Sequence, residues 1–352
     1  MSKPGYSAAS RLLHKIALQS KFIAEASFDL ESMLIKKKDT ALPDNHVFIS
    51  GLARSGTTIL LQYLYETGLF SSLTYLDMPF VLMPNIWKRI SYKNPSTVYS
   101  ERAHRDGIMI GFDSPEAFEE VFWRVFCSES YIGIDRLKLH DPDESMLKKF
   151  RDYIGSILLS NNSQDQRYLS KNNNNVLRFK GLNHILPNSQ IIIPFRDPLQ
   201  QAVSLLDQHL HFSKIQEEDK FSLDYMNWLG HFEFGLNQKP FFLNDEKTFK
   251  EMANYAKTDI NFWLLSWKNY YQYVNSQAIN NSIFFSYERF CMAPSVVLDR
   301  LFEVLNIEKI YSKPKPFKPV IAKIDHFNQD LLGECSAIYK QMEIKHDLWF
   351  NR

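Results

Sequence analysis

Residues 46–65 constrain the fold more than any other segment. A short apolar run at 46–50 precedes Gly51-Leu-Ala-Arg-Ser-Gly-Thr-Thr58, and an apolar pattern with helical spacing begins at Ile59. A glycine turn between a strand and a helix lets backbone N–H groups converge on phosphate oxygens, and the helix N-terminus adds favourable partial charge. The segment therefore predicts a phosphate-binding loop in an α/β protein.

Strands and helices alternate along the rest of the chain. Strands are expected at 46–50, 72–76, 167–170, 191–195 and 282–285. Helices are expected at 8–38, from Ser114-Pro115-Glu116 onward, at 143–159, from Asp197-Pro198, at 222–277 with a break near 239–240, at 294–305 and at 328–343. Three consecutive isoleucines at 191–193 suit a parallel strand that is covered on both faces. We therefore predict a P-loop-containing nucleotide hydrolase-like α/β fold, with a central parallel sheet of about five strands flanked by helices.

The glycine loop departs from the Walker A pattern at one position. It fits G-x-x-x-x-G-K-[ST] except that Thr57 replaces the lysine. That lysine serves the β- and γ-phosphates of a nucleoside triphosphate. A ligand with a single 5′-phosphate does not need it, and Arg54, Ser55 and Thr57 supply a guanidinium and two hydroxyls instead. A glycine turn without a ligand is the weaker alternative.

A second basic motif follows the strand at 191–195. Arg196 comes at the carboxyl end of this strand, where open α/β sheets bind their ligands. Ser204 lies two turns into the next helix and can share one anionic group with Arg196. The alternative is that Arg196 pairs with an acid and Ser204 is a neutral helix residue. The spacing of the two residues, downstream of the glycine loop, favours anion binding.

These segments resemble the sulfotransferases that use 3′-phosphoadenosine 5′-phosphosulfate (PAPS). Residues 51–58 resemble the 5′-phosphosulfate loop of that family, 196–204 its 3′-phosphate motif, and Tyr287-Glu288 its Tyr-Glu pair at a strand end. The resemblance spans about 46–306 and is strongest to the bacterial and tyrosylprotein-type branch. It implies PAPS as co-substrate, its desulfated form PAP as product, and no metal. The residues that it places around PAPS are Arg54, Ser55, Gly56, Thr57, Thr58, Arg196 and Ser204.

Lys171 is the predicted activator of the leaving group. The strand at 167–170 delivers it to the carboxyl edge of the sheet, and the resemblance implies that it faces the bridging oxygen of PAPS. Asn173 stands where the family usually has proline. A lysine at that oxygen neutralises charge that builds on the leaving phosphate. The alternative is a surface lysine beside the asparagine run at 172–175.

The acceptor hydroxyl needs a base. The resemblance implies a carboxylate about twenty residues beyond the glycine loop, which is Asp77 here. Its alternative role is a cap or turn residue. His104 is the rival because imidazole titrates near neutrality. Glu116 and Glu120 are weaker candidates, and we expect Glu116 to serve as a helix cap and Glu120 as a solvated or packing residue.

The resemblance divides the chain into three parts. Residues 1–45 are expected to form a helical segment that packs on the core, and 46–306 the sulfotransferase domain. Within that domain, residues 79–166 are expected to form a mostly helical insert on the acceptor side. Residues 307–352, which follow the domain, are expected to form a C-terminal extension. A hydroxyl-bearing acceptor is implied, with a carbohydrate or other small metabolite as candidates, and homo-oligomerisation stays open.

Composition and residue spacing narrow the possible ligands and cellular locations of the protein. The 41 Lys and Arg balance 40 Asp and Glu, which argues against a surface that grips nucleic acid. Three cysteines without C-x-x-C spacing favour a reducing compartment. His209 and His211 are two residues apart on a helix and point away from each other, so a metal site is not expected. The sequence contains no run of about 18 apolar residues, so no transmembrane helix is expected. A cytoplasmic, bacterial enzyme is the favoured interpretation.

Two rival functions stay open at this level. A small-molecule P-loop kinase would depend on ATP and magnesium. Thr57, at the position of the Walker A lysine, argues against this function. A catalytically inactive homologue would bind PAP without transferring a sulfuryl group, and the asparagines beside Lys171 keep that interpretation open.

Overall fold

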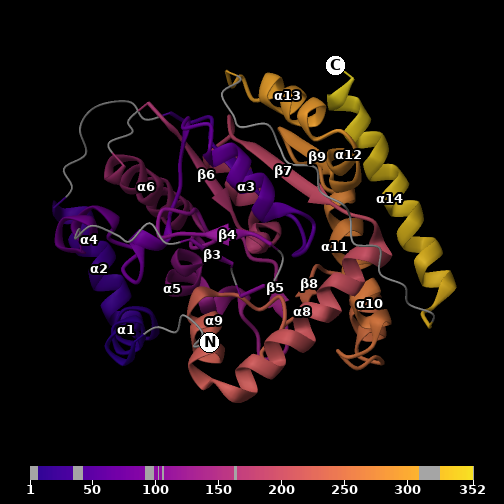
Figure 1. Ribbon diagram of the computed structural model, residues 1–352, viewed down its shortest axis with the longest axis horizontal. Helices are drawn as coiled ribbons and strands as arrows, with labels where there is room; N and C mark the ends of the chain where they lie inside the picture. Colours follow the sequence, from indigo (N-terminus) through magenta and orange to yellow (C-terminus); the bar gives the residue numbers. More distant parts are fainter. Residues whose placement is uncertain are drawn as a thin grey trace.

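The computed structural model describes residues 7–34, 43–91, 99–101, 103–104, 107–161, 165–308 and 326–351. Its centre is a five-stranded sheet in the order β2-β6-β1-β7-β9, and every neighbouring pair is parallel. The strands are β1 (Val47–Ile49), β2 (Phe70–Ser71), β6 (Arg167–Lys171), β7 (Gln190–Phe195) and β9 (Ser282–Ser286). This sheet, flanked by helices, confirms the predicted α/β class (Figure 1).

Apolar side chains cover both faces of the sheet. Along β7, Ile192 belongs to one buried cluster with Val47 and Ile49 of β1, whereas Ile191 and Ile193 belong to the other. Successive side chains of a strand point to opposite faces, so this division places a core on each side. The isoleucine run is therefore buried on both faces, as its composition predicts.

Helices enclose the sheet and follow its strands. Those of the sheet region are α3 (Thr57–Tyr65), α8 (Pro198–Glu218), α11 (Ile260–Ser276), α12 (Tyr287–Met292), α13 (Pro294–Val304) and α14 (Gln329–Phe350). In Figure 1, α14 runs along one side of the molecule, and α1 (Ala8–His14) and α2 (Lys21–Leu34) lie at the opposite side. The helix α14 extends beyond the predicted 328–343 because Trp349 is buried and its Nε1 donates to the Phe284 carbonyl at 2.6 Å.

The other elements connect these layers. They are a π-helical segment (Lys15–Gln19), η2 (Tyr75–Asp77), α4 (Pro84–Ser91), β3 (Ser100–Glu101), β4 (Met109–Ile110), α5 (Glu120–Tyr131), β5 (Leu137–Lys138), α6 (Glu144–Ser160), η3 (Asn173–Arg178), α7 (Phe179–Ile185), α9 (Lys220–Leu229), β8 (Phe241–Phe242) and α10 (Glu246–Met252). Residues 35–38 of the predicted N-terminal helix lie outside the described residues. None of the described helices has the length and apolar character that a membrane span requires.

Three local predictions were wrong. The helix expected from Ser114 begins at Glu120, because Pro115 forms an antiparallel bridge with Thr74 and holds this segment extended. The strand expected at 72–76 ends at Ser71, because a capping box between Thr74 and Asp77 turns the chain into η2. The helical stretch expected at 222–277 is broken over a longer segment than 239–240, where β8 pairs with β5.

Two predicted helix starts are confirmed. Asp143 begins α6, and its Oδ1 accepts a hydrogen bond from the Met146 amide at 2.8 Å. Asp197 begins α8, with Pro198 in its first turn, and accepts from the Gln200 amide at 2.9 Å. Both caps satisfy amides that a helix start leaves without partners, so their sequence signal is local.

Candidate active site

The loop between β1 and α3 has the conformation that its glycines permit. Gly56 has φ +90° and Arg54 has φ +71°, both in the left-handed region. A Cβ atom on Gly51 would lie 2.6 Å from the Pro194 carbonyl oxygen, so only glycine fits against β7 there. No described side chain caps α3. The start of α3 is therefore not capped by a described side chain, which suits an anion site.

The loop and the second basic motif meet above β1 and β7. The Arg54 Nε donates to the Ser204 Oγ at 3.0 Å, and an Arg196 terminal nitrogen lies 3.5 Å from the Arg54 carbonyl oxygen. Residues that are 150 positions apart are thus in direct contact. The structure brings together the two segments that the sequence assigned to opposite ends of one ligand.

Arg196 is a buried cation that has spare hydrogen-bonding capacity. Its guanidinium stacks 5.0 Å from the Tyr287 ring centroid, and its buried Nε has no hydrogen-bond partner. Within the described part of the chain, no carboxylate forms an ion pair with it. A buried guanidinium usually has an anionic partner. This chemistry fits the phosphate of a nucleotide ligand.

Tyr287 and Glu288 support this corner of the site. Glu288 Oε1 accepts from the Asp197 amide at 3.0 Å, and its Oε2 accepts from the Tyr339 hydroxyl of α14 at 3.0 Å. Burial raises the pKa of Glu288, against these hydrogen bonds. The turn that carries Arg196 is therefore tied to the C-terminal helix.

Lys171 lies at the carboxyl end of β6, next to β1. Its backbone pairs with Ile49, two residues before the glycine loop. Its side chain is 9% exposed, and its Nζ lies 3.5 Å from Glu116 Oε1. The alternative of a surface lysine is therefore not what the structure shows.

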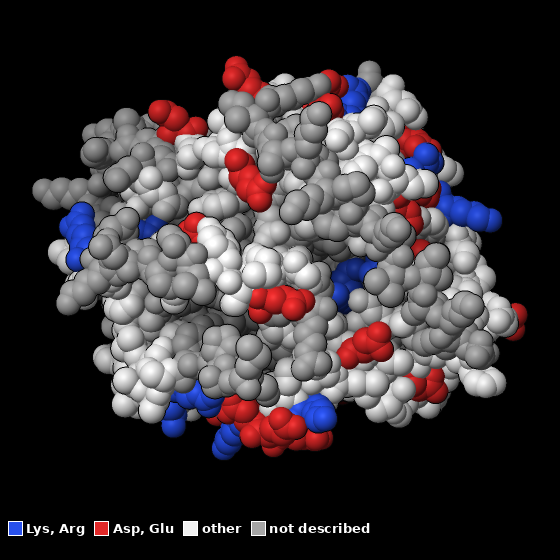
Figure 2. All heavy atoms as spheres, in the orientation of Figure 1, with Lys and Arg blue, Asp and Glu red and all other residues white. Residues whose placement is uncertain are grey.

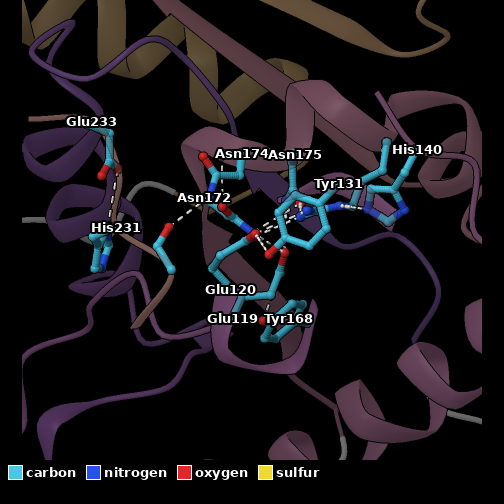
Figure 3. Close-up of polar contacts among 12 residues, drawn as sticks. Glu119, Glu120, Tyr131, His140, Tyr168, Asn172, Asn174, Asn175, His231 and Glu233 are labelled. Atoms are coloured by element: carbon cyan, nitrogen blue, oxygen red, sulfur yellow. Dashed lines mark hydrogen bonds and ion pairs between the residues drawn. The ribbon is translucent and has the colours of Figure 1, made fainter. Parts of the chain in front are cut away.

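The asparagine run after Lys171 is buried rather than a surface loop. Asn172 Nδ2 donates to Glu119 Oε1 at 3.1 Å and to Glu120 Oε2 at 2.8 Å, and Asn175 Nδ2 donates to Glu119 at 2.9 Å (Figure 3). Glu120 also pairs with the fully buried Arg178 at 2.7 Å. These bonds hold the turn directly behind Lys171. Sequence analysis missed this cluster, because about fifty residues separate its two halves.

A second carboxylate approaches Lys171 from the 231–235 segment. Glu233 Oε1 accepts from Asn173 Nδ2 at 3.0 Å and lies 3.4 Å from His231 Nδ1. Burial by itself would raise the pKa of Glu233, but His231 and the Lys171 ammonium together lower it to about 2. Glu233 is therefore ionised at neutral pH and partly compensates the charge of Lys171.

The two sequence candidates for the base have structural contacts. Asp77 is 1% exposed; its Oδ2 accepts from the Thr74 amide at 2.8 Å, and its Oδ1 lies 3.3 Å from Lys88 Nζ. The His104 ring packs against Phe212, with 5.0 Å between centroids. Among the described contacts, none joins Asp77 to Lys171 or Arg196.

Charge over the molecular surface is mixed. On the face drawn in Figure 2, Lys and Arg side chains lie among acidic ones, and basic atoms are recessed in a hollow near its centre. Among the described residues, no three His, Cys, Asp or Glu side chains gather in a way that would hold a metal ion. The three cysteines, Cys127, Cys291 and Cys335, are free and buried.

Comparison with known proteins agrees with this geometry. The model of the sulfotransferase family matches residues 46–311. Among solved structures, the chain is similar to sulfotransferase STF1 from Mycobacterium tuberculosis, with a TM-score of 0.50 and 12% identity over 99% of this chain and 88% of that one. It is also similar to sulfotransferase STF9 from Mycobacterium avium, with a TM-score of 0.41 and 11% identity over 96% and 78%. No curated protein matches the chain significantly.

The likeness to STF1 supports the P-loop-type α/β fold, and the family match covers more than half of the 352 residues. This chain belongs to the sulfotransferase family.

Proposed function

We propose that the chain transfers a sulfuryl group from PAPS to a hydroxyl group of an acceptor, with a carbohydrate or another small metabolite as the candidate acceptor. The observation that supports it most is the contact between the two basic motifs, Arg54 with Ser204 and Arg196 with Arg54. Two anion-binding segments at adjacent strand ends suit a nucleotide with phosphates at both its 5′ and 3′ positions.

Each group of residues has a proposed role. Arg54, Ser55, Gly56, Thr57 and Thr58 would hold the 5′-phosphosulfate against the start of α3. Arg196 and Ser204 would hold the 3′-phosphate. The buried Nε of Arg196, which lacks a partner, supports this role.

Lys171 would stabilise the leaving phosphate. Its ammonium is largely buried, where a charge acts more strongly than in water. The asparagine cluster behind it would limit its motion, and pre-organised charge costs no reorganisation during the reaction.

The kinase alternative is disfavoured by Thr57 at the position of the Walker lysine. The non-catalytic alternative is disfavoured by the burial of Lys171 next to the loop.

We further propose a bacterial, cytoplasmic setting, supported by the free cysteines and the bacterial sources of the similar structures.

Calorimetric titration with PAP, ATP and GTP tests the donor. We expect PAP to bind at least tenfold more tightly than ATP or GTP. Tighter binding of ATP in the presence of magnesium would favour the kinase, and no binding of PAP would refute the proposal. Transfer from ³⁵S-labelled PAPS to a panel of sugars, phenols and alcohols then tests catalysis, and transfer to none of them would favour the inactive homologue.

A further inference from the structure

Glu116 does not have the role of a helix cap. The segment before α5 is extended: Pro115 bridges Thr74, and the Glu116 amide donates to the Leu73 carbonyl at 3.1 Å. Residues 73–74 directly follow β2, and β2 is the neighbour of β6 in the sheet. Backbone pairing therefore fixes Glu116 beside the strand that ends in Lys171.

The Glu116 carboxylate is held in one orientation. Its Oε1 lies 3.5 Å from Lys171 Nζ and accepts from the Ala117 amide at 2.9 Å, and its Oε2 accepts from the Tyr75 hydroxyl at 3.3 Å. The side chain is 11% exposed. It is thus a positioned carboxylate in contact with the group that would touch the leaving oxygen.

The position of Lys171 limits where a base can stand. The lysine must lie within hydrogen-bond reach of the leaving oxygen, and the base within reach of the attacking one, about 3 Å in each case. The reacting atoms approach to roughly 3–3.5 Å before transfer. The base must therefore lie within about 10 Å of Lys171 Nζ. Glu116 meets this limit, because its Oε1 lies 3.5 Å from Lys171 Nζ. Asp77 instead contacts Thr74 and Lys88.

We propose that Glu116 is the catalytic base of the sulfuryl transfer. This inference rests on the proposed function. The Glu116 carboxylate removes the proton from the acceptor hydroxyl while the hydroxyl oxygen forms a bond to sulfur. The bond between sulfur and the bridging oxygen breaks, and its electron pair stays on the phosphate oxygen next to Lys171. The products are the sulfate ester, PAP and a protonated Glu116, which releases its proton to solvent.

The ion pair with Lys171 gives the base a dependence on the donor. Without ligand, Lys171 Nζ lies 3.5 Å from Glu116 Oε1. When the donor binds, the negative charge of its phosphosulfate favours the protonated form of Glu116. Glu116 thus becomes a stronger base when a sulfuryl group is present to be transferred.

Hydrolysis of PAPS tests the inference, because water serves as acceptor and no natural acceptor is needed. Release of ³⁵S-sulfate from labelled PAPS is compared for wild type, Glu116→Gln and a control, Glu246→Gln, whose exposed carboxylate pairs with Lys250 at 3.6 Å. A general base contributes about 10²–10⁴-fold. We expect the rate to fall about 100-fold or more in Glu116→Gln and to stay unchanged in the control. In Glu116→Ala, added formate should restore part of the rate.

Calorimetry with PAP separates the possible failures. We expect PAP to bind both Glu116 variants within about threefold of wild type, since the base acts on the acceptor side. Equal hydrolysis by wild type and Glu116→Gln, whether fast or undetectable, overturns the assignment. Loss of PAP binding in both variants gives Glu116 a structural role and also overturns it. Failure of the wild type to bind PAP instead refutes the proposed function.

Discussion

Gly56 links the glycine loop to Arg196 through Tyr287, and replacing it by alanine should test that link. Gly56 has φ +90°, and an added Cβ would lie 2.7 Å from Tyr287 Cδ2. Tyr287 in turn stacks on Arg196. Gly56→Ala keeps the backbone N–H of the loop, so its effects come from backbone strain and from the displaced ring.

The two contributions have separate magnitudes. The left-handed conformation costs a residue with a Cβ about 1–2 kcal/mol. Overpacking against the tyrosine adds about 1–3 kcal/mol. The free energy of unfolding should therefore fall by about 2–5 kcal/mol. Displacement of the ring weakens its contact with the guanidinium, worth about 0.5–2 kcal/mol, so PAP affinity should fall by about tenfold.

Gly68 provides the matched control. It has φ +72°, but an added Cβ there meets nothing within 4 Å. Gly68→Ala should lose only the strain contribution and should bind PAP like wild type. Urea unfolding followed by tryptophan fluorescence measures the free energies, and calorimetry measures PAP binding. The double variant Gly56→Ala/Tyr287→Ala should recover the overpacking contribution. Equal losses in Gly56→Ala and Gly68→Ala, with equal PAP affinities, would refute the reasoning.

Further predictions concern the lysine, the buried acid cluster and the buried histidine. Lys171→Ala should lower PAPS turnover by at least 100-fold while PAP binding stays within about threefold, because Lys171 acts on the leaving oxygen; unchanged turnover in a ³⁵S assay would remove it from the mechanism. Glu120→Gln should cost about 3–5 kcal/mol in urea unfolding, because it leaves Arg178 as an unpaired buried charge, and a loss below 1 kcal/mol would contradict this. Burial, together with the charge of Arg167, lowers the pKa of His46 to about 4 from 6.5, so its stability contribution is complete above pH 6.5 and is lost as the pH falls toward 4. Between pH 7 and pH 5, the free energy of unfolding of the wild type should fall by about 2 kcal/mol more than that of His46→Gln. Equal falls in the two proteins would show that His46 does not titrate in this way.

Local signals in the sequence were sufficient for the framework of the fold. The apolar run at 46–50, the glycine loop and the helix after it depend on residues close together in the chain. The caps Asp143 and Asp197 also act within one helical turn. For this reason the parallel sheet, the phosphate-type loop and the placement of Arg196 at a strand end could be predicted.

Contacts between distant residues could not be predicted in the same way. Ser114-Pro115-Glu116 has the composition of a helix start, yet the bridge from Pro115 to Thr74 competes successfully with it. Glu119 and Asn172 bind each other from elements whose pairing no local pattern reveals. The surroundings of Lys171, including its contact with Glu116, therefore emerged only from the structure.

The hydrogen-bonded order β6-β1-β7 fixes the spacing of the three segments that are proposed to hold the donor. Lys171, the glycine loop and Arg196 emerge from three adjacent strands, whose axes lie about 4.8 Å apart. This interval belongs to the backbone ladder and does not change when side chains are exchanged. Sequence changes in the segments between β2 and β6 do not alter the hydrogen-bonded pairing of these three strands. We therefore expect relatives to vary the residues between β2 and β6 that lie outside Glu116, Glu119 and Glu120, and to keep the spacing of Lys171, the glycine loop and Arg196.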